Sequence, residues 1–270
     1  MIILVDSYGN HFNTLFQNMH LELFCEETNH RLINLGQLDD FDNLYETNTF
    51  MPRIIRKFLS TLTTIFIRTR LIKVKHFDDI NESFESVITR LGNKRLHYID
   101  GWGIRMNQLT EKAETHQIYA NRFALRDEFF ENNELYKQIH QTKEQNKKVV
   151  GIHIRRGDYV NYLDGKYFFS ISSYLDLINQ MKILIQKLYK ADTVFVIFST
   201  DDFSELASEQ LLVSTNDWYI DQKLMTCCDY LIGPPSTFTG WASYTGNVPL
   251  YHIEDVNHNV QLHDFFIMND

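Results

Sequence analysis

Two adjacent arginines follow a short apolar run in the middle of the chain. Residues 149–155 are rich in β-branched side chains, which indicates a buried strand, and Arg155, Arg156 and Asp158 stand at its end. Open α/β sheets bind their ligands at the ends of strands. Because two guanidinium groups are costly there without an anion to bind, the motif predicts a site for a phosphate-bearing ligand.

Arg155 is the arginine that we expect to contact this ligand, because its planar fork can meet two phosphate oxygens at once. Successive residues of a strand face opposite ways, so Arg156 is expected to point elsewhere and to pair with Asp158. His153 lies two residues before Arg155 and shares its face. A lone histidine in an apolar run usually belongs to the core, but the shared face favours a contact with the ligand.

Polar residues also follow two other strands expected in the second half of the chain. Asp201 comes after the strand expected at 193–199, and Ser236 comes shortly after the strand expected at 230–232. Parallel strands all end at the same edge of their sheet. We therefore expect these residues and Arg155 to line one crevice.

The residues at these strand ends have structural as well as functional interpretations. Asp201 and Asp202 lack a third acidic neighbour and the spacing of a metal-binding pair, so we expect no metal there. Asp201 fits a helix N-cap or an acceptor for a ribose hydroxyl. Ser236 and Thr237 fit the N-cap of the helix that follows, and the free N–H groups of that helix end would suit a phosphate.

Strands and helices alternate through the second half, which predicts a parallel, doubly wound sheet. Its expected strands lie at 149–155, 193–199, 230–232 and 248–253, and its expected helices at 171–189, 204–212, 217–228 and 236–244. The first half is expected to contain strands at 2–5, 31–35 and 97–99 and helices at 13–27 and 131–144. A hydrophilic stretch then places a domain boundary between residues 145 and 146.

Residues 51–77 form a basic and apolar segment without any acidic residue. A membrane surface or an anionic ligand would suit such a segment. A helix followed by a strand, with its cations in water, is the more common structure for this pattern, and it is our prediction.

The bulk composition excludes several classes of protein. The net charge of −9 argues against a general nucleic-acid-binding protein, which needs a basic face. Three cysteines lack the spacing of a disulfide or metal scaffold. No apolar run is long enough to span a bilayer, and the chain begins as a strand, so we predict a cytoplasmic protein without stable membrane insertion. The glycine motifs of dehydrogenases and P-loop enzymes are missing.

Residues 153–159, with the sequence His-Ile-Arg-Arg-Gly-Asp-Tyr, resemble the HxRRxD motif that several groups of fucosyltransferases share. Three further blocks resemble the α1,2-fucosyltransferases of glycosyltransferase family 11. They lie at residues 13–17, 100–102 and 221–242, and the last contains Ser-Thr-Phe at 236–238. The blocks cover nearly the whole chain in the order of that family.

The resemblance implies an α/β fold of the GT-B type, in which two Rossmann-like domains face a cleft. Residues 1–145 would bind the acceptor and residues 146–270 the nucleotide sugar. The implied donor is GDP-β-L-fucose, and the implied acceptor is a sugar hydroxyl of a glycan. The implied reaction inverts the donor to an α-fucoside, forms an α1,2 linkage, and requires no metal or other cofactor.

The same resemblance assigns roles to residues of the second half. Arg155 would hold the β-phosphate, His153 would contact the nucleotide, and Asp221 would read the guanine. Ser236, Thr237 and Phe238 belong to the Ser-Thr-Phe block, and Asp201 joins the expected donor site from its place at the end of a strand.

The general base stays open among three residues. Asp158 and Asp164 are the carboxylates nearest the motif, with Asp158 preferred, and His11 belongs to a crevice around residues 8–13 that we expect to meet the acceptor. Two alternative functions also stay open: a transferase of the same fold that uses another nucleotide sugar, and a non-catalytic module that binds a nucleotide or a glycan. The oligomeric state is not predicted.

Overall fold

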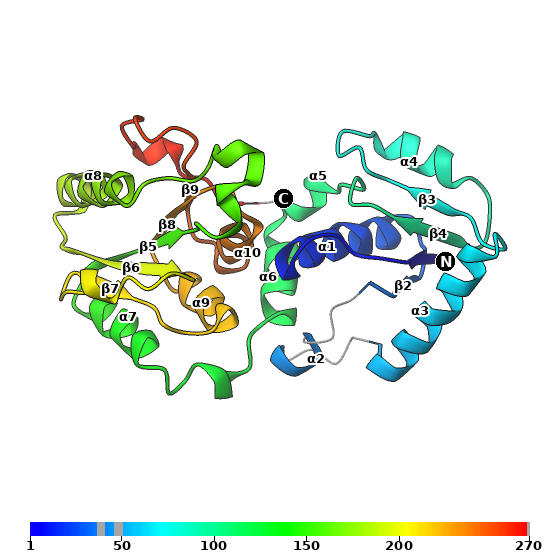
Figure 1. The fold of residues 1–270 in the computed structure, drawn as a ribbon, viewed down its shortest axis with the longest axis horizontal. Helices are drawn as coiled ribbons and strands as arrows, with labels where there is room; N and C mark the ends of the chain where they lie inside the picture. Colours follow the sequence, from blue (N-terminus) through cyan, green and yellow to red (C-terminus); the bar gives the residue numbers. More distant parts are fainter. Residues whose placement is uncertain (37–40, 46–50, 269–270) are drawn as a thin grey trace. The chain divides into compact units, whose positions relative to one another are not determined.

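The computed structural model describes residues 1–36, 41–45 and 51–268, and the chain forms two compact units (Figure 1). The first unit runs from Met1 to Ala124 and the second begins at Leu125. The boundary expected between residues 145 and 146 falls after helix α7 (Glu134–Glu144), whereas the units divide before it. The reason is that Ile139 of α7 is fully buried in the core of the second unit.

The first unit contains a four-stranded parallel sheet in the order β2-β1-β4-β3. Its strands are β1 (Ile2–Leu4), β2 (Leu32–Asn34), β3 (Val74–His76) and β4 (His97–Asp100). Its helices are α1 (His11–Glu27), α2 (Phe41–Leu44), α3 (Arg53–Arg68), α4 (Phe84–Leu91), α5 (Asn107–Thr110) and α6 (Ala113–Arg122). The expected strand-helix-strand start is confirmed by β1, α1 and β2, and the helix and strand expected within 51–77 are α3 and β3.

Helix α1 is tied to the end of β4 by a buried hydrogen bond. The side-chain amide of Gln17 donates to the backbone oxygen of Gly101 at 2.7 Å. Gly101 has a φ of +88°, and a Cβ atom there would lie 2.2 Å from the backbone oxygen of Phe77, so the turn after β4 requires glycine. The contact joins two of the blocks that carry the family resemblance.

The second unit contains a five-stranded parallel sheet in the order β7-β6-β5-β8-β9. The strands are β5 (Lys148–Ile154), β6 (Thr193–Ser199), β7 (Leu211–Val213), β8 (Tyr230–Gly233) and β9 (Leu250–His252). Beside α7, the helices are α8 (Ile171–Tyr189), α9 (Trp218–Met225) and α10 (Thr237–Gly246). Short 3₁₀ turns lie at 127–129, 158–160, 162–165, 204–206 and 262–264.

Alternate residues of these strands pack into two separate hydrophobic cores, one on each face of the sheet. Val150, Ile152 and Ile154 of β5 pack with α8, whereas Val149 packs with residues of α7, α9 and α10. Side chains of a strand point alternately to opposite faces, so both faces of the sheet must be covered. The doubly wound arrangement predicted for this half is confirmed.

One predicted helix of the second unit is wrong. Residues 204–212 form a single 3₁₀ turn at 204–206 and then the short strand β7. β7 pairs with residues 195–197 of β6 at the edge of the sheet. The serines, glutamates and leucines of this stretch suit a helix, and the edge pairing with β6 overrides that local preference.

No helix among the described residues is long and apolar enough to cross a membrane. The predicted cytoplasmic location stays a prediction.

Candidate active site

The three polar strand ends of the second unit lie on neighbouring strands. β8, β5 and β6 are adjacent and parallel, so Gly233, Ile154 and Ser199 end them at one edge of the sheet. The predicted convergence of these ends is confirmed. Seven-residue strands with almost every side chain buried hold this edge in place.

Arg155 is held from three sides at this edge. Its Nε and Nη2 atoms donate to the two carboxylate oxygens of Asp158 at 3.0 and 2.6 Å, and Nη1 donates to Ser236 Oγ at 3.1 Å. The guanidinium also lies 4.5 Å from the centre of the Tyr159 ring. A guanidinium that is oriented in this way has already lost much of the rotational freedom that binding an anion would cost.

The expected pair of Arg156 with Asp158 is wrong. The turn after β5 brings Asp158 back onto Arg155, three residues earlier, and the hydrogen bonds from Arg155 lower the pKa of the Asp158 carboxyl. Arg156 instead lies with its Nε 3.4 Å from Oδ2 of Asp201 and with its guanidinium 4.8 Å from the centre of the Phe168 ring. Asp201 therefore bridges the ends of β6 and β5 in the structure.

Ser236 connects the arginine to the start of α10. Its side-chain oxygen accepts from the backbone N–H of Phe238 at 3.2 Å, which is an N-cap, and it also accepts from Arg155. The predicted N-cap is confirmed. Thr237 is the first residue of α10, so the positive end of the helix dipole lies beside a guanidinium. Two positive groups together favour a doubly charged anion such as a diphosphate.

His153 lies fully inside the same edge. Burial, and to a lesser extent the charge of Arg155, lowers the pKa of its imidazole to about 3, so the ring is neutral at physiological pH. Its ring centre is 5.1 Å from that of Phe238. Its Nδ1 atom is buried without a hydrogen-bond partner among the described residues. A neutral ring with an unused nitrogen suits a contact with a ligand hydroxyl or amide.

Sequence reasoning overlooked His252, which ends β9. The register places His153, Gly233 and His252 side by side on three neighbouring strands. A Cβ atom at Gly233 would lie 2.9 Å from Cβ of His153, so the absence of a side chain at Gly233 leaves space for His153. Burial lowers the pKa of His252 to about 4, and its Nε2 also lacks a partner among the described residues. Its position beside β8 could have been inferred only from the order of the strands.

Sequence reasoning also assigned no role to Tyr159 beyond its place in the motif. The Tyr159 ring is 5% exposed, and its hydroxyl donates to the backbone oxygen of Pro235. Tyr159 thereby links the turn after β5 to the turn before α10. The guanidinium of Arg155 packs over the face of this ring.

Asp221 lies on α9, close in sequence to the end of β7. Its carboxylate is 6% exposed and accepts from the hydroxyl of Ser214, the first residue after β7. Burial raises the pKa of Asp221 to about 7, although hydrogen bonds from Ser214 and Asn216 oppose the shift. A buried carboxyl with a pKa near 7 is a candidate for binding a ligand that donates hydrogen bonds.

His11 and Asp164, the other two candidates for the base, belong to different units. His11 is the first residue of α1 in the first unit. Asp164 belongs to the 3₁₀ turn at 162–165 of the second unit and has a positive φ of 55°. Their predicted role as the base stays a prediction.

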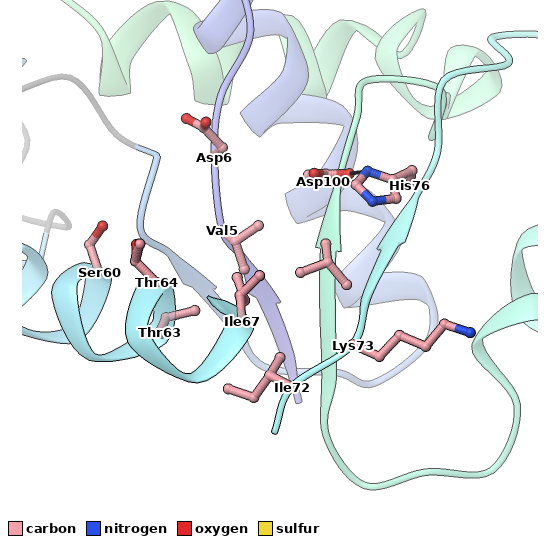
Figure 2. A pocket seen from close by; sticks show the side chains of 11 residues that line it. Val5, Asp6, Ser60, Thr63, Thr64, Ile67, Ile72, Lys73, His76 and Asp100 are labelled. Carbon is pink, nitrogen blue, oxygen red and sulfur yellow. Dashed lines mark ion pairs between the residues drawn. The ribbon is translucent and has the colours of Figure 1, made fainter. Parts of the chain in front are cut away.

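The first unit has its own pocket, of about 560 Å³, between α3 and the sheet (Figure 2). Asp6 and Asp100 line it, and His76 Nδ1 lies 2.5 Å from Asp100 Oδ1. Burial raises the pKa of Asp100, although the pairing with His76 opposes that shift. Ser60, Thr63 and Thr64 of α3 line the opposite wall.

The sequence matches the model of a known protein family. The model of glycosyl transferase family 11 matches residues 41–261, which is more than half of the chain. No curated protein matches the sequence.

Solved structures of fucosyltransferases have the same fold at low sequence identity. An Arabidopsis thaliana FUT1 mutant in complex with GDP is 12% identical over 94% of this chain and 71% of that chain, with a TM-score of 0.54. POFUT1 in complex with GDP is 12% identical over 90% and 93%, with a TM-score of 0.52. The α1,6-fucosyltransferase NodZ soaked with GDP-fucose is 11% identical over 95% and 97%, with a TM-score of 0.55. The predicted α/β class of fold is confirmed.

Proposed function

Because this chain belongs to glycosyltransferase family 11, we propose that it transfers L-fucose from GDP-β-L-fucose to a sugar hydroxyl of a glycan. The transfer inverts the donor and forms an α1,2-linked fucoside. The observation that supports the proposal most is the preoriented guanidinium of Arg155 beside the N-terminus of α10. Fucosyltransferases with the same fold are described as complexes with GDP and GDP-fucose.

The first task of the reaction is to stabilise the departing diphosphate. Arg155 and the backbone N–H groups at the start of α10 provide a fixed positive site for the charge that develops as the fucosyl bond breaks. In the structure the carboxylate of Asp158 occupies the fork of Arg155. A bound diphosphate competes for the same donors, so donor binding releases Asp158. We propose that this reaction needs no metal, and full activity after treatment with a chelator would support that.

The second task is selection of the nucleotide. Asp221 in its ionised form accepts two hydrogen bonds from guanine, one from the ring N–H and one from the exocyclic amine. Adenine and uracil lack that pair of donors. His153 and Phe238 form a neutral, partly aromatic wall in the same unit, which suits the nucleoside part of the donor.

The third task is activation of the acceptor hydroxyl. We assign the general base to Asp158, because donor binding frees its carboxylate beside the reacting diphosphate. The low pKa of Asp158 in the free enzyme rises once its carboxylate is released from the hydrogen bonds of Arg155, which makes the carboxylate a better base. His11 is the alternative base from the first unit, and the crevice around residues 8–13 receives the acceptor.

A donor panel tests the proposal directly. The enzyme is incubated with GDP-fucose, GDP-mannose, UDP-sugars or CMP-sugars and a set of terminal galactosides, and products are detected by mass spectrometry. We expect a gain of one deoxyhexose with GDP-fucose only, and NMR of the product should show an α1,2 linkage. Transfer from another donor would identify a different nucleotide sugar. GDP binding without hydrolysis or transfer would identify a non-catalytic module.

A further inference from the structure

Helix α3, which Figure 1 labels in the first unit, exposes several large apolar side chains to solvent. Ile54, Phe58 and Ile65 are 84%, 62% and 48% exposed, and their spacing of four and seven residues places them along one side of the helix. Ile55 and Phe66 continue this surface around the helix, with 50% and 41% of their areas exposed. We call these five residues the apolar face of α3.

The opposite side of α3 faces the protein and is mostly polar, with Ile67 as an apolar residue among its hydroxyl-bearing neighbours. Arg56 and Thr63 are buried, and Ser60 and Thr64 line the pocket between the helix and the sheet (Figure 2). A helix on the surface of a globular protein ordinarily does the reverse and buries its apolar stripe. Folding of this unit therefore does not account for the apolar face, and a contiguous exposed surface of this kind marks a contact with an apolar partner.

The charges around the apolar face restrict the identity of that partner. Residues 51–77 contain seven lysines and arginines and no acidic residue, although the whole chain has a net charge of −9. Arg68 ends α3, and Arg70 and Lys73 follow it, all three exposed. Apolar side chains flanked by cations suit the surface of an anionic membrane, where the chains enter the headgroup region and the cations meet phosphate.

We propose that α3, together with residues 69–73, binds the surface of membranes that contain anionic lipids. The helix has 16 residues, so it lies along the surface and does not span the bilayer. A second copy of this chain is a poorer partner, because a symmetric pair would bring the same cations against one another. The proposal concerns a surface outside the donor site and does not depend on the identity of the donor.

Sedimentation with vesicles tests this proposal on the whole chain. We expect the protein to sediment with vesicles of phosphatidylcholine and phosphatidylglycerol, to bind pure phosphatidylcholine much more weakly, and to be released by salt. The combined variant Ile54→Ser, Phe58→Ser and Ile65→Ser should reduce partitioning at least about tenfold, because each side chain contributes through apolar burial. The combined variant Arg68→Gln and Arg70→Gln should lose the preference for phosphatidylglycerol.

A matched variant distinguishes this face from surface hydrophobicity in general. Ile118, Ile183 and Leu188 are exposed apolar residues of α6 and α8, so changing all three to serine removes similar area elsewhere. That variant should bind vesicles as the wild type does, and all variants should keep the melting temperature and GDP affinity of the wild type. Equal sedimentation of the two serine variants would overturn the proposal. So would a wild type that ignores vesicles, or one that dimerises through the apolar face in analytical ultracentrifugation without binding lipid.

Discussion

The strand ends of the two sheets carry different charged groups. At the edge where β5, β6 and β8 end, the second unit presents Arg155 and Arg156, each paired with an aspartate, beside a helix N-terminus. Where β1 and β4 end, the first unit presents Asp6 and Asp100. Both sheets are parallel and place their polar residues at the same kind of edge. The topology therefore fixes where a ligand can bind, while the residues after each strand decide which ligand it is.

The two sheet edges also differ in the length of the strands that hold them in place. β5 and β6 have seven residues each and are buried throughout their interiors, whereas β1, β2 and β3 have three residues each. Seven paired residues hold neighbouring strand ends more firmly than three. A diphosphate site needs such fixed donors, because catalysis by preoriented charge depends on groups that do not rearrange during the reaction.

The largest effect on kcat should come from changing the proposed general base, Asp158. The same change tests which unit supplies the base. Asp158→Asn should lower kcat by about 10²–10⁴-fold, which is the usual contribution of general base catalysis. GDP affinity should stay equal or rise, because the variant removes a carboxylate that competes for Arg155. Steady-state kinetics and calorimetry measure the two quantities.

The matched change in the first unit is His11→Asn. It should lower kcat much less than Asp158→Asn does. A normal kcat in Asp158→Asn together with a collapse in His11→Asn would move the base to the first unit.

Arg155→Ala should follow in size. Arg155 is partly buried and hydrogen-bonded. Loss of a charged donor of this kind costs about 2–5 kcal/mol, so kcat/KM should fall by roughly 30-fold to several thousand-fold. Arg156→Ala is the control one residue away, and it should lose much less because Arg156 pairs with the exposed Asp201. Equal losses in both variants would mean that the guanidinium of Arg155 has no special role.

A change in the turn after β4 should destabilise the first unit and leave GDP binding by the folded protein unchanged. Gly101→Ala forces a side chain into a positive φ and against the backbone oxygen of Phe77, so we expect a destabilisation of at least about 1–3 kcal/mol. Differential scanning calorimetry should show a lowered transition, while GDP affinity of the folded protein stays unchanged. Gly157→Ala is a matched control, because a Cβ atom there meets nothing within 4 Å. An unchanged transition in Gly101→Ala would show that the turn adapts.

Much of this comparison could be predicted from the sequence. The β-branched runs at 149–155 and 193–199 identified long buried strands, and a parallel sheet then required Arg155, Asp201 and Ser236 to meet at one edge. The pairing of the two arginines could not be predicted, because strand alternation no longer applies once the chain turns after Ile154. Asp158 reaches Arg155 only through that turn.

Two other features depend on contacts between distant segments. β7 forms because β6 offers an edge, although its own residues resemble a helix. His252 joins His153 because β8 lies between their strands, and the order of strands in a sheet is not written in the local sequence. Single-sequence patterns report local preference and periodicity, so both features required the tertiary structure.

The smallest predicted effect concerns the pH dependence of GDP binding and tests the role of Asp221. The ionised carboxylate is the form that accepts hydrogen bonds from guanine, and burial raises the pKa of Asp221 to about 7. The ionised fraction rises from about one tenth at pH 6 to about nine tenths at pH 8, so GDP affinity should increase by about tenfold over that interval. Phosphate also titrates near pH 6 and contributes to the wild-type profile.

The decisive quantity is therefore the difference between the wild type and Asp221→Asn, measured by calorimetry at each pH. The variant should bind GDP more weakly and with a flatter profile. Parallel profiles would remove Asp221 from the guanine site and leave Arg155 and the start of α10 as the supported part of the donor site.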